Sequence, residues 1–305
     1  MSLIMKNLLR AITCFLLSTF LAIGSHALAQ DQPGLAGGYH PLLWEIKGTN
    51  HSVFLFGSIH IAKPDFYPLP DYIEQAYRQA DVVAVEVDPS AAGAGAKMAP
   101  FITYAAPDKL QKHLTPGMWQ RVAAKLGPTA EQVQPMKPAM LSVLMSLGVY
   151  GDLGYAPQAG IDLHFISRAK ADNKSLVELE TIEFQAAVLG GLNDQDGESM
   201  LKQMLDGMEN GEAIDYANRI ADGWKSGNAA GLVQLFEAEA RQDPGSAHVM
   251  KLLIDDRNPE MARKIARLFT DGKNAFVVVG VGHLVGSRSV VDLLQKQGLD
   301  VRQLH

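Results

Sequence analysis

Short apolar runs, separated by stretches with helical spacing, make up most of the chain. Near the start, residues 42–46 and 53–56 are mostly apolar and flank a Lys-Gly-Thr-Asn turn, which predicts a β-hairpin. Residues 71–80 then place apolar side chains at helical spacing, and residues 82–87 are almost all apolar. This pattern predicts a hairpin, a helix and a strand buried on both faces.

The rest of the chain continues this alternation. Helices are expected at 115–126, 138–149 and 160–171, a second short buried strand at 176–179, and helical structure from 181 to 189 and from 198 to 270. A third buried strand at 275–279, a helix at 287–297 and an edge strand at 301–304 complete the pattern. Strands at both ends with a helical middle predict an α/β fold, with a mixed sheet and a large helical insertion.

The first 29 residues differ from the rest. Lys6 and Arg10 precede an apolar stretch from 11 to 24, and Ala27-Leu28-Ala29 forms a small-residue cleavage pattern. A membrane anchor is the alternative, but the stretch is shorter than the ~20 residues of a comfortable span. We therefore expect a cleaved signal peptide at 1–29, a single domain at 30–305 and a periplasmic protein with no stable membrane span in its mature chain.

The composition of the chain excludes several classes of protein and kinds of site. The 305 residues, 47% hydrophobic and 20% charged, allow a sizeable core and exclude a disordered chain. The net charge of −6 comes without a basic stripe, so nucleic acid is not expected as a partner. Cys14 is the single cysteine and lies in the predicted signal peptide, which excludes a disulfide scaffold and a zinc site built from cysteines.

Two nine-residue segments match each other. Residues 52–60 form an apolar strand that ends in Gly57-Ser58-Ile59-His60, and residues 275–283 form another that ends in Gly280-Val281-Gly282-His283. Glycine lets the backbone turn at the strand end and leaves room for a ligand. One Gly-x-x-His pattern is weak, whereas two copies after buried strands indicate paired units, each with a histidine at its carboxyl edge.

The other two predicted buried strands end in carboxylates, Glu86 and Glu180. If the four strands are mostly parallel, these carboxylates and the two histidines meet at one sheet edge, where α/β proteins usually bind ligands. Two imidazoles and two carboxylates suit a divalent metal such as Zn, Mn, Co or Fe, and a three-ligand site would leave one carboxylate as general base. Each residue alone is equally consistent with a turn or a helix N-terminus.

The motifs resemble those of the TraB/GumN family, the bacterial relatives of the animal Tiki proteases. Besides the two Gly-x-x-His segments, the resemblance rests on Val85-Glu86-Val87-Asp88, Gly160-Ile161-Asp162, Leu179-Glu180-Thr181 with Gln185, Trp224 with Gly227, and Arg257-Asn258. It covers nearly all of the predicted mature chain. It implies a Tiki/erythromycin-esterase-like fold of two related βαβ-type halves, and a metal-dependent hydrolase, since Tiki relatives are proteases that need a divalent metal.

The resemblance also implies roles for single residues. His60 and His283 would bind the metal; Glu86 would be a third ligand or the general base, and Glu180 would take the other role. We favour Glu86 as ligand, because it follows His60 in the same β-α-β unit, and Glu180 as base. Arg257 would steady the developing oxyanion.

Structural alternatives stay open for three of these positions. Arg257 is also consistent with an ion pair to Asp255 or Glu260 on the adjoining helix. Asn258 precedes a proline and could cap that helix. Asp162 could orient a ligand histidine or cap its own helix.

Three functions follow from these residues. The first is a periplasmic metal-dependent hydrolase, a metallopeptidase that acts on peptides or a related small molecule. The second is a metal-free esterase in which His60 or His283 is the general base. The third is a non-enzymatic periplasmic protein that binds metal or haem through the same histidines.

Overall fold

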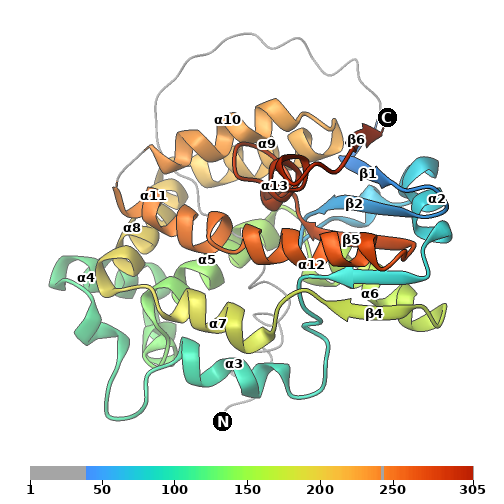
Figure 1. Cartoon of the computed structure of the whole chain (residues 1–305). Helices are drawn as coiled ribbons and strands as arrows, with labels where there is room; N and C mark the ends of the chain where they lie inside the picture. The colour runs from blue at the N-terminus through green and yellow to red at the C-terminus, as the bar shows by residue number, and fades with distance from the viewer. Residues whose placement is uncertain (1–38, 242–243, 305) are drawn as a thin grey trace, which may run out of the picture.

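A six-stranded sheet forms the centre of the computed structural model, which describes residues 39–241 and 244–304 (Figure 1). The strands are β1 Leu43–Lys47, β2 Ser52–Ser58, β3 Val82–Val85, β4 Ser175–Glu178, β5 Ala275–Gly280 and β6 Val301–Leu304, in the order β4-β3-β5-β2-β1-β6. β4, β3, β5 and β2 are parallel, and β1 is antiparallel to both of its neighbours. The mixed α/β class and the predicted hairpin are confirmed.

Helices cover both faces of this sheet. They are α2 Asp71–Gln79 and α6 Ile161–Ala171 on one face, and α12 Asn258–Thr270 on the other, with α13 Val290–Lys296 beside β6. Tyr77 of α2 and Phe165 of α6 pack on Phe276 of β5, with ring centroids 5.9 and 4.8 Å from that of Phe276. These aromatic contacts fix α6, which carries Asp162, against the sheet.

The remaining helices gather on the side where the parallel strands end (Figure 1). They are α3 Ala94–Ile102, α4 Pro116–Leu126, α5 Pro138–Asp152, α7 Ile182–Gly190, α8 Asp194–Asn210, α9 Glu212–Lys225, α10 Ala229–Ala240 and α11 Pro244–Met250. Short 3₁₀ turns lie at Pro64–Phe66, Leu110–His113, Gly127–Val133, Pro157–Ala159 and Val281–His283, and a π-helical turn at Lys251–Asp255. As predicted, Thr115 caps α4 and Pro116 occupies its first turn.

The helical part is not one insertion. The segment between β3 and β4 contains α3 to α6, and the segment between β4 and β5 contains α7 to α12. β4 also differs from the prediction of a buried strand, because it pairs only with β3 and its side chains are half-buried or exposed. Since edge and inner strands can share the same short apolar run, the sequence did not distinguish them.

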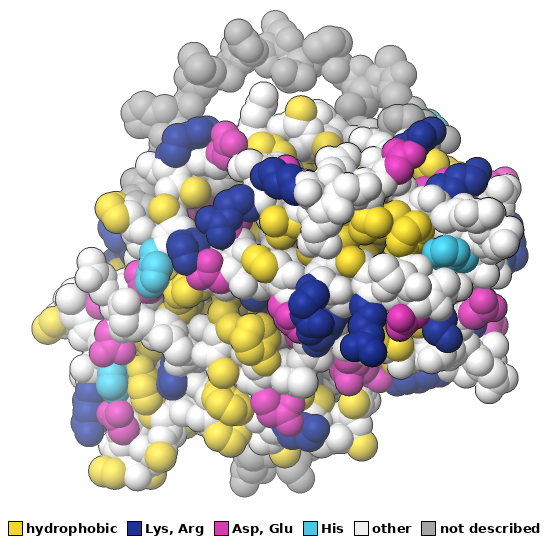
Figure 2. Space-filling model, viewed as in Figure 1, with side chains coloured by type: hydrophobic (Ala, Val, Ile, Leu, Met, Phe, Trp, Pro, Cys, Tyr) yellow, Lys and Arg dark blue, Asp and Glu magenta, His cyan; other side chains and the backbone are white. Residues whose placement is uncertain are grey.

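Two predictions concern the membrane and the surface charge. No helix within 39–241 and 244–304 combines the length and the apolar character needed to cross a membrane. The predicted signal peptide, 1–29, lies outside the described residues. Figure 2 shows basic and acidic side chains next to one another on the face that includes α12, where Glu260 pairs with Arg263. On this face the basic side chains are mixed with acidic ones, as expected from a sequence without a basic stripe.

Candidate functional site

The four predicted site residues follow four neighbouring parallel strands. Along the sheet the order is Glu180 after β4, Glu86 after β3, His283 after β5 and His60 after β2. Their exposed fractions are 7%, 1%, 0% and 4%. Parallel strands that end at one edge therefore bring two carboxylates and two imidazoles to one buried region, with the carboxylates on one side and the histidines on the other.

Arg257 joins the two carboxylates. Its Nη2 donates to Glu86 Oε2 at 2.7 Å and to Glu180 Oε2 at 2.5 Å, its Nε donates to Glu180 Oε1 at 3.0 Å, and its Nη1 donates to the Leu253 carbonyl at 2.7 Å. Arg257 is 5% exposed. Its partners are therefore the site carboxylates, which lie far away in sequence, and not the adjacent Asp255 or Glu260.

Gln185 of α7 makes a second bridge. Its Nε2 donates to Glu180 Oε2 at 2.8 Å and to Glu86 Oε2 at 3.1 Å, and the Gly280 N–H donates to Glu86 Oε1 at 2.7 Å. Thr181 caps α7, so the turn after Glu180 places Gln185 on the helix face towards the carboxylates. Arg257 and Gln185 thus hold Glu86 and Glu180 as a fixed pair.

His60 is held by Asp162. The His60 Nδ1 lies 2.5 Å from Asp162 Oδ2, and the Ser58 hydroxyl donates to Asp162 Oδ1 at 2.7 Å. The Asp162 carboxylate accepts from both groups, so the His60 Nδ1 carries a proton and Nε2 is the ring nitrogen that points away from Asp162. Asp162 therefore orients a site histidine, which is the first of the two alternatives that the sequence left open.

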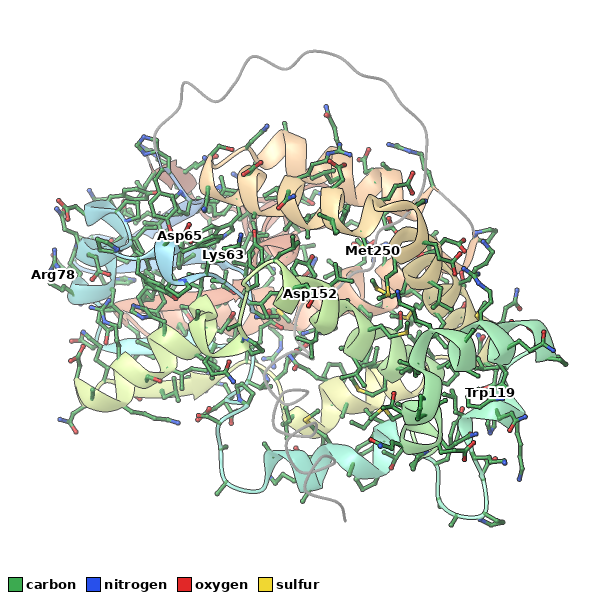
Figure 3. All side chains as sticks on the ribbon, turned by 180° about the vertical axis from the view of Figure 1, so that it is seen from behind. Lys63, Asp65, Arg78, Trp119, Asp152 and Met250 are labelled. Atoms are coloured by element: carbon green, nitrogen blue, oxygen red, sulfur yellow. The ribbon has the colours of Figure 1, made fainter. Side chains whose placement is uncertain are left out.

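Backbone contacts fix α6 in this position. Gly160, just before α6, lies so close to His60 that a Cβ there would sit 2.1 Å from the His60 carbonyl oxygen. Ala62 and Ala156 pair as an isolated antiparallel bridge between the loop after β2 and the loop after α5. Figure 3 shows Lys63 and Asp65 in the first loop, and Asp152 at the end of α5. These contacts hold the start of α6, and with it Asp162, next to His60.

His283 is held by Asn258, at the start of α12. The His283 Nδ1 lies 2.6 Å from Asn258 Oδ1, and the Asn258 Nδ2 donates to the Arg288 carbonyl at 2.9 Å. The His283 Nε2 lies 3.9 Å from Glu86 Oε1 and has no hydrogen-bond partner among the described residues. The side chain of Asn258 thus points towards the site. It does not cap α12, which was the structural alternative that the sequence left open.

Burial perturbs the ionisation of this region. Burial raises the pKa of the Glu86 carboxyl, although Arg257 acts to lower it. Burial also holds the pKa of His283 well below its ordinary value, and the positive charge of Arg257 lowers it further. His283 is therefore a neutral imidazole near pH 7, and it adds no positive charge to the carboxylate pair.

The histidines fit a divalent metal better than the carboxylates do. Each histidine has its Nδ1 bonded to a buried acceptor, the arrangement that directs Nε2 of a ligand histidine to a metal. Glu86 and Glu180 instead face Arg257 and Gln185. Across the described ranges no group of three or more His, Cys, Asp or Glu side chains is arranged to hold a metal ion. The donor set present is two imidazoles beside Glu86.

Sequence reasoning missed three partners of the site. Ser58, Gln185 and Asn258 were noted only as parts of motifs or as a helix cap, yet each donates to, or accepts from, a buried charged or aromatic group of the site. The spacing of Gln185 five residues after Glu180 was the available signal, because it places the amide in the first turns of the following helix.

Comparison with known proteins gives distant relatives. Uncharacterized protein YbaP of Shigella flexneri is 28% identical over 155 residues, which cover 49% of this chain and 56% of that protein. Uncharacterized protein YbaP of Escherichia coli (strain K12) is 28% identical over 151 residues, covering 48% and 54%. Metalloprotease TIKI1 of Xenopus tropicalis is 23% identical over 312 residues, covering 85% and 60%.

The matches therefore span only about half to three fifths of the length of these relatives. No solved structure matches the chain. A sequence profile, in contrast, matches residues 42–303, a range that contains nearly all of the six strands and every site residue described above. On this match the chain belongs to the TraB/PrgY/gumN family.

Proposed function

We propose that this protein is a metal-dependent hydrolase that cleaves peptides. The observation that carries the proposal is the pair of buried histidines, His60 and His283, each with Nδ1 bonded to a buried acceptor and both beside a buried carboxylate pair. The distant relative TIKI1 bears the name metalloprotease, and its match covers 85% of this chain, which supports peptides as the substrate class.

In this proposal His60, His283 and Glu86 hold the ion, as the family resemblance implies. A bound Zn, Mn, Co or Fe ion would supply a Lewis acid that polarises the substrate carbonyl. Asp162 and Asn258 keep the proton of each imidazole on Nδ1, so that the lone pair of each ring is on Nε2. Glu86 lies beside His283, with its Oε1 at 3.9 Å from His283 Nε2.

Glu180 is the proposed general base. Its carboxylate would take the proton of the attacking water and pass it to the leaving amine. Arg257 has two roles. It holds Glu180 against Glu86, and with four of its five N–H groups in the contacts described, it has one N–H left for the developing oxyanion.

We also propose that the mature protein acts in the periplasm and that its sheet consists of two related βαβ-type halves. Support for the location comes from Lys6, Arg10, the apolar run that follows them and the cleavage pattern at 27–29. Support for the two halves comes from β2 and β5, which are parallel neighbours and each lead into a Gly-x-x-His turn.

The test is metal analysis beside a peptide-library cleavage assay, with Mn, Co and Zn supplied in turn. Replacing both His60 and His283 with Ala should bring metal stoichiometry near zero with the fold intact. The matched control is His248→Ala, which changes a half-exposed histidine on α11. Glu180→Gln should keep the metal and lose about 10²- to 10⁴-fold in rate, and Glu86→Gln should weaken metal binding. A wild type that binds metal but cleaves nothing would refute the hydrolase.

One observation favours a second candidate, a metal-free hydrolase with His60 as general base. The contact of 2.5 Å between His60 Nδ1 and Asp162 Oδ2 is the arrangement that orients a catalytic imidazole. Cleavage of ester substrates that survives exhaustive chelation, and that Asp162→Asn reduces, would support this candidate over the metal-dependent one.

A further inference from the structure

Asn258 contacts two groups that together determine its orientation. It is 1% exposed and occupies the first turn of α12, directly after Arg257. Its Nδ2 lies 2.9 Å from the Arg288 carbonyl oxygen, and its Oδ1 lies 2.6 Å from His283 Nδ1. A carbonyl oxygen only accepts, so the amide nitrogen must face Arg288 and the amide oxygen must face the histidine.

This orientation dictates the tautomer of His283. The Asn258 Oδ1 can only accept a hydrogen bond, so His283 must carry its proton on Nδ1. In a neutral imidazole the lone pair is then on Nε2. That atom is buried, has no hydrogen-bond partner in the described part of the chain, and lies 3.9 Å from Glu86 Oε1.

The opposite tautomer would be the natural choice for a purely structural histidine. A proton on Nε2 would face Glu86 Oε1, 3.9 Å away, which is too long for a direct hydrogen bond but gives an attractive electrostatic contact. With the proton on Nδ1, a lone pair and a carboxylate oxygen face the same space, which disfavours the arrangement unless an electrophile or a donor lies between them. Asn258 therefore keeps His283 in the state that can bind a ligand.

The loop that presents the Arg288 carbonyl has an unusual backbone. Arg288 adopts a φ of +64°, a left-handed conformation that is unfavourable for a residue with a Cβ. The carboxylate of Asp292, on α13, accepts the Arg288 N–H at 2.9 Å and supports this conformation. Unfavourable backbone of this kind persists where surrounding contacts enforce it, and it often does so at functional sites.

We propose that Asn258 is a positioning residue that fixes His283 as the Nδ1–H tautomer, with the Nε2 lone pair directed to a ligand beside Glu86. An amide suits this position because it accepts from Nδ1 without adding a third negative charge next to Glu86 and Glu180. The tautomer assignment is independent of the proposed activity, whereas its consequence for metal binding rests on the proposed function.

The direct test is the protonation of His283 in the whole chain, without metal. Long-range ¹H–¹⁵N correlation spectra of ¹⁵N-histidine-labelled protein, recorded after chelation at pH 7.5, distinguish the two tautomers, and His283→Gln assigns the signals. The expected result is a proton on Nδ1 and a bare Nε2. A proton on Nε2 would overturn the proposal, and this measurement needs no variant of Asn258.

Variants then test the role of Asn258. Asn258→Leu, which removes the acceptor, should shift His283 towards the Nε2–H tautomer and weaken Zn binding about 10- to 100-fold, the usual cost of losing a ligand's hydrogen-bond partner. Asn258→Asp keeps an acceptor and should keep the Nδ1–H tautomer. Asn228→Ala removes the side-chain cap at the start of α10 and no contact of Asn258 or His283 described above, so it should change neither.

The outcomes separate this inference from the proposed function. An Asn258→Leu protein that is folded and keeps the Nδ1–H tautomer fully populated would refute the positioning role. The proposed tautomer in a protein that binds no Mn, Co or Zn would refute the metal-dependent function alone, and the assignment of Asn258 would stand.

Discussion

Replacing Gly160 with Ala should separate Asp162 from His60. A Cβ on residue 160 would lie 2.1 Å from the His60 carbonyl oxygen and 2.8 Å from its carbonyl carbon, both of which are backbone atoms that no side-chain rotation can move. Ordinary contact begins near 3.4 Å. The start of α6 must therefore retreat from β2 by about 1.3 Å, the difference between 3.4 and 2.1 Å.

The size of the effect follows from this displacement. If α6 moves directly away, the distance from His60 Nδ1 to Asp162 Oδ2 grows from 2.5 to about 3.8 Å, which is too long for a hydrogen bond. Overpacking of this kind typically costs about 1–3 kcal/mol of unfolding free energy. Loss of the acceptor behind a ligand histidine should also weaken divalent-metal binding by about 10- to 100-fold.

The assay is urea unfolding together with calorimetric titration of Zn or Mn. Gly148→Ala is the matched control, because it makes the same change inside α5, where a new Cβ meets nothing within 4 Å. The control should gain about 0.5–1 kcal/mol, since alanine favours a helix interior over glycine. A Gly160→Ala protein with wild-type stability and wild-type metal affinity would refute the close approach of α6 to His60.

Three further changes test other contacts. Arg257→Met leaves two buried carboxylates without their cation and should cost about 3–5 kcal/mol in urea unfolding; an unchanged midpoint would contradict the bridge. Trp224→Phe removes the hydrogen bond from Nε1 to the Gly57 carbonyl at 2.7 Å and should cost about 1–3 kcal/mol by the same measurement. His113 lies 2.9 Å from a carboxylate oxygen at each ring nitrogen, and although burial acts to lower its pKa, these two carboxylates raise it overall. A raised pKa means that the imidazolium stabilises the fold below the unfolded pKa of about 6.5 and that this contribution is lost as the pH rises through the folded value. The stability difference between wild type and His113→Gln should therefore be larger at pH 6 than at pH 9, and an equal difference at both would refute the pairing.

The sheet was largely predictable because its strands are coded by short apolar runs. β2, β3 and β5 are buried along nearly their whole length, and a short apolar run between turn residues is typical of such strands. β4 has a similar sequence but lies at the edge of the sheet, because the order of the strands is set by how all of them pair and not by one strand alone. A single strand contains no information on that choice.

The site was predictable only in part, for a similar reason. His60 and His283 follow strands and repeat the same local motif, so sequence alone could pair them. Arg257 binds Glu86 and Glu180, which lie 171 and 77 residues away in the sequence. The residues around Arg257 give no reason to prefer these distant partners to the adjacent Asp255 or Glu260. Asn258 is a good capping residue by type, and its inward orientation depends on the backbone of the loop that holds Arg288.

The register of the sheet explains how these residues meet. Ser58 pairs with Gly280, and Val85 pairs with both Val278 and Glu178, so the strands end within two residues of one another. A shift of one residue in any pair would turn that strand's side chains to the opposite face and disrupt their packing against the helices that cover each face. The apolar core therefore enforces the register, and the polar side chains beyond the strand ends contribute little to it. For this reason the His60 and His283 substitutions should leave the sheet folded.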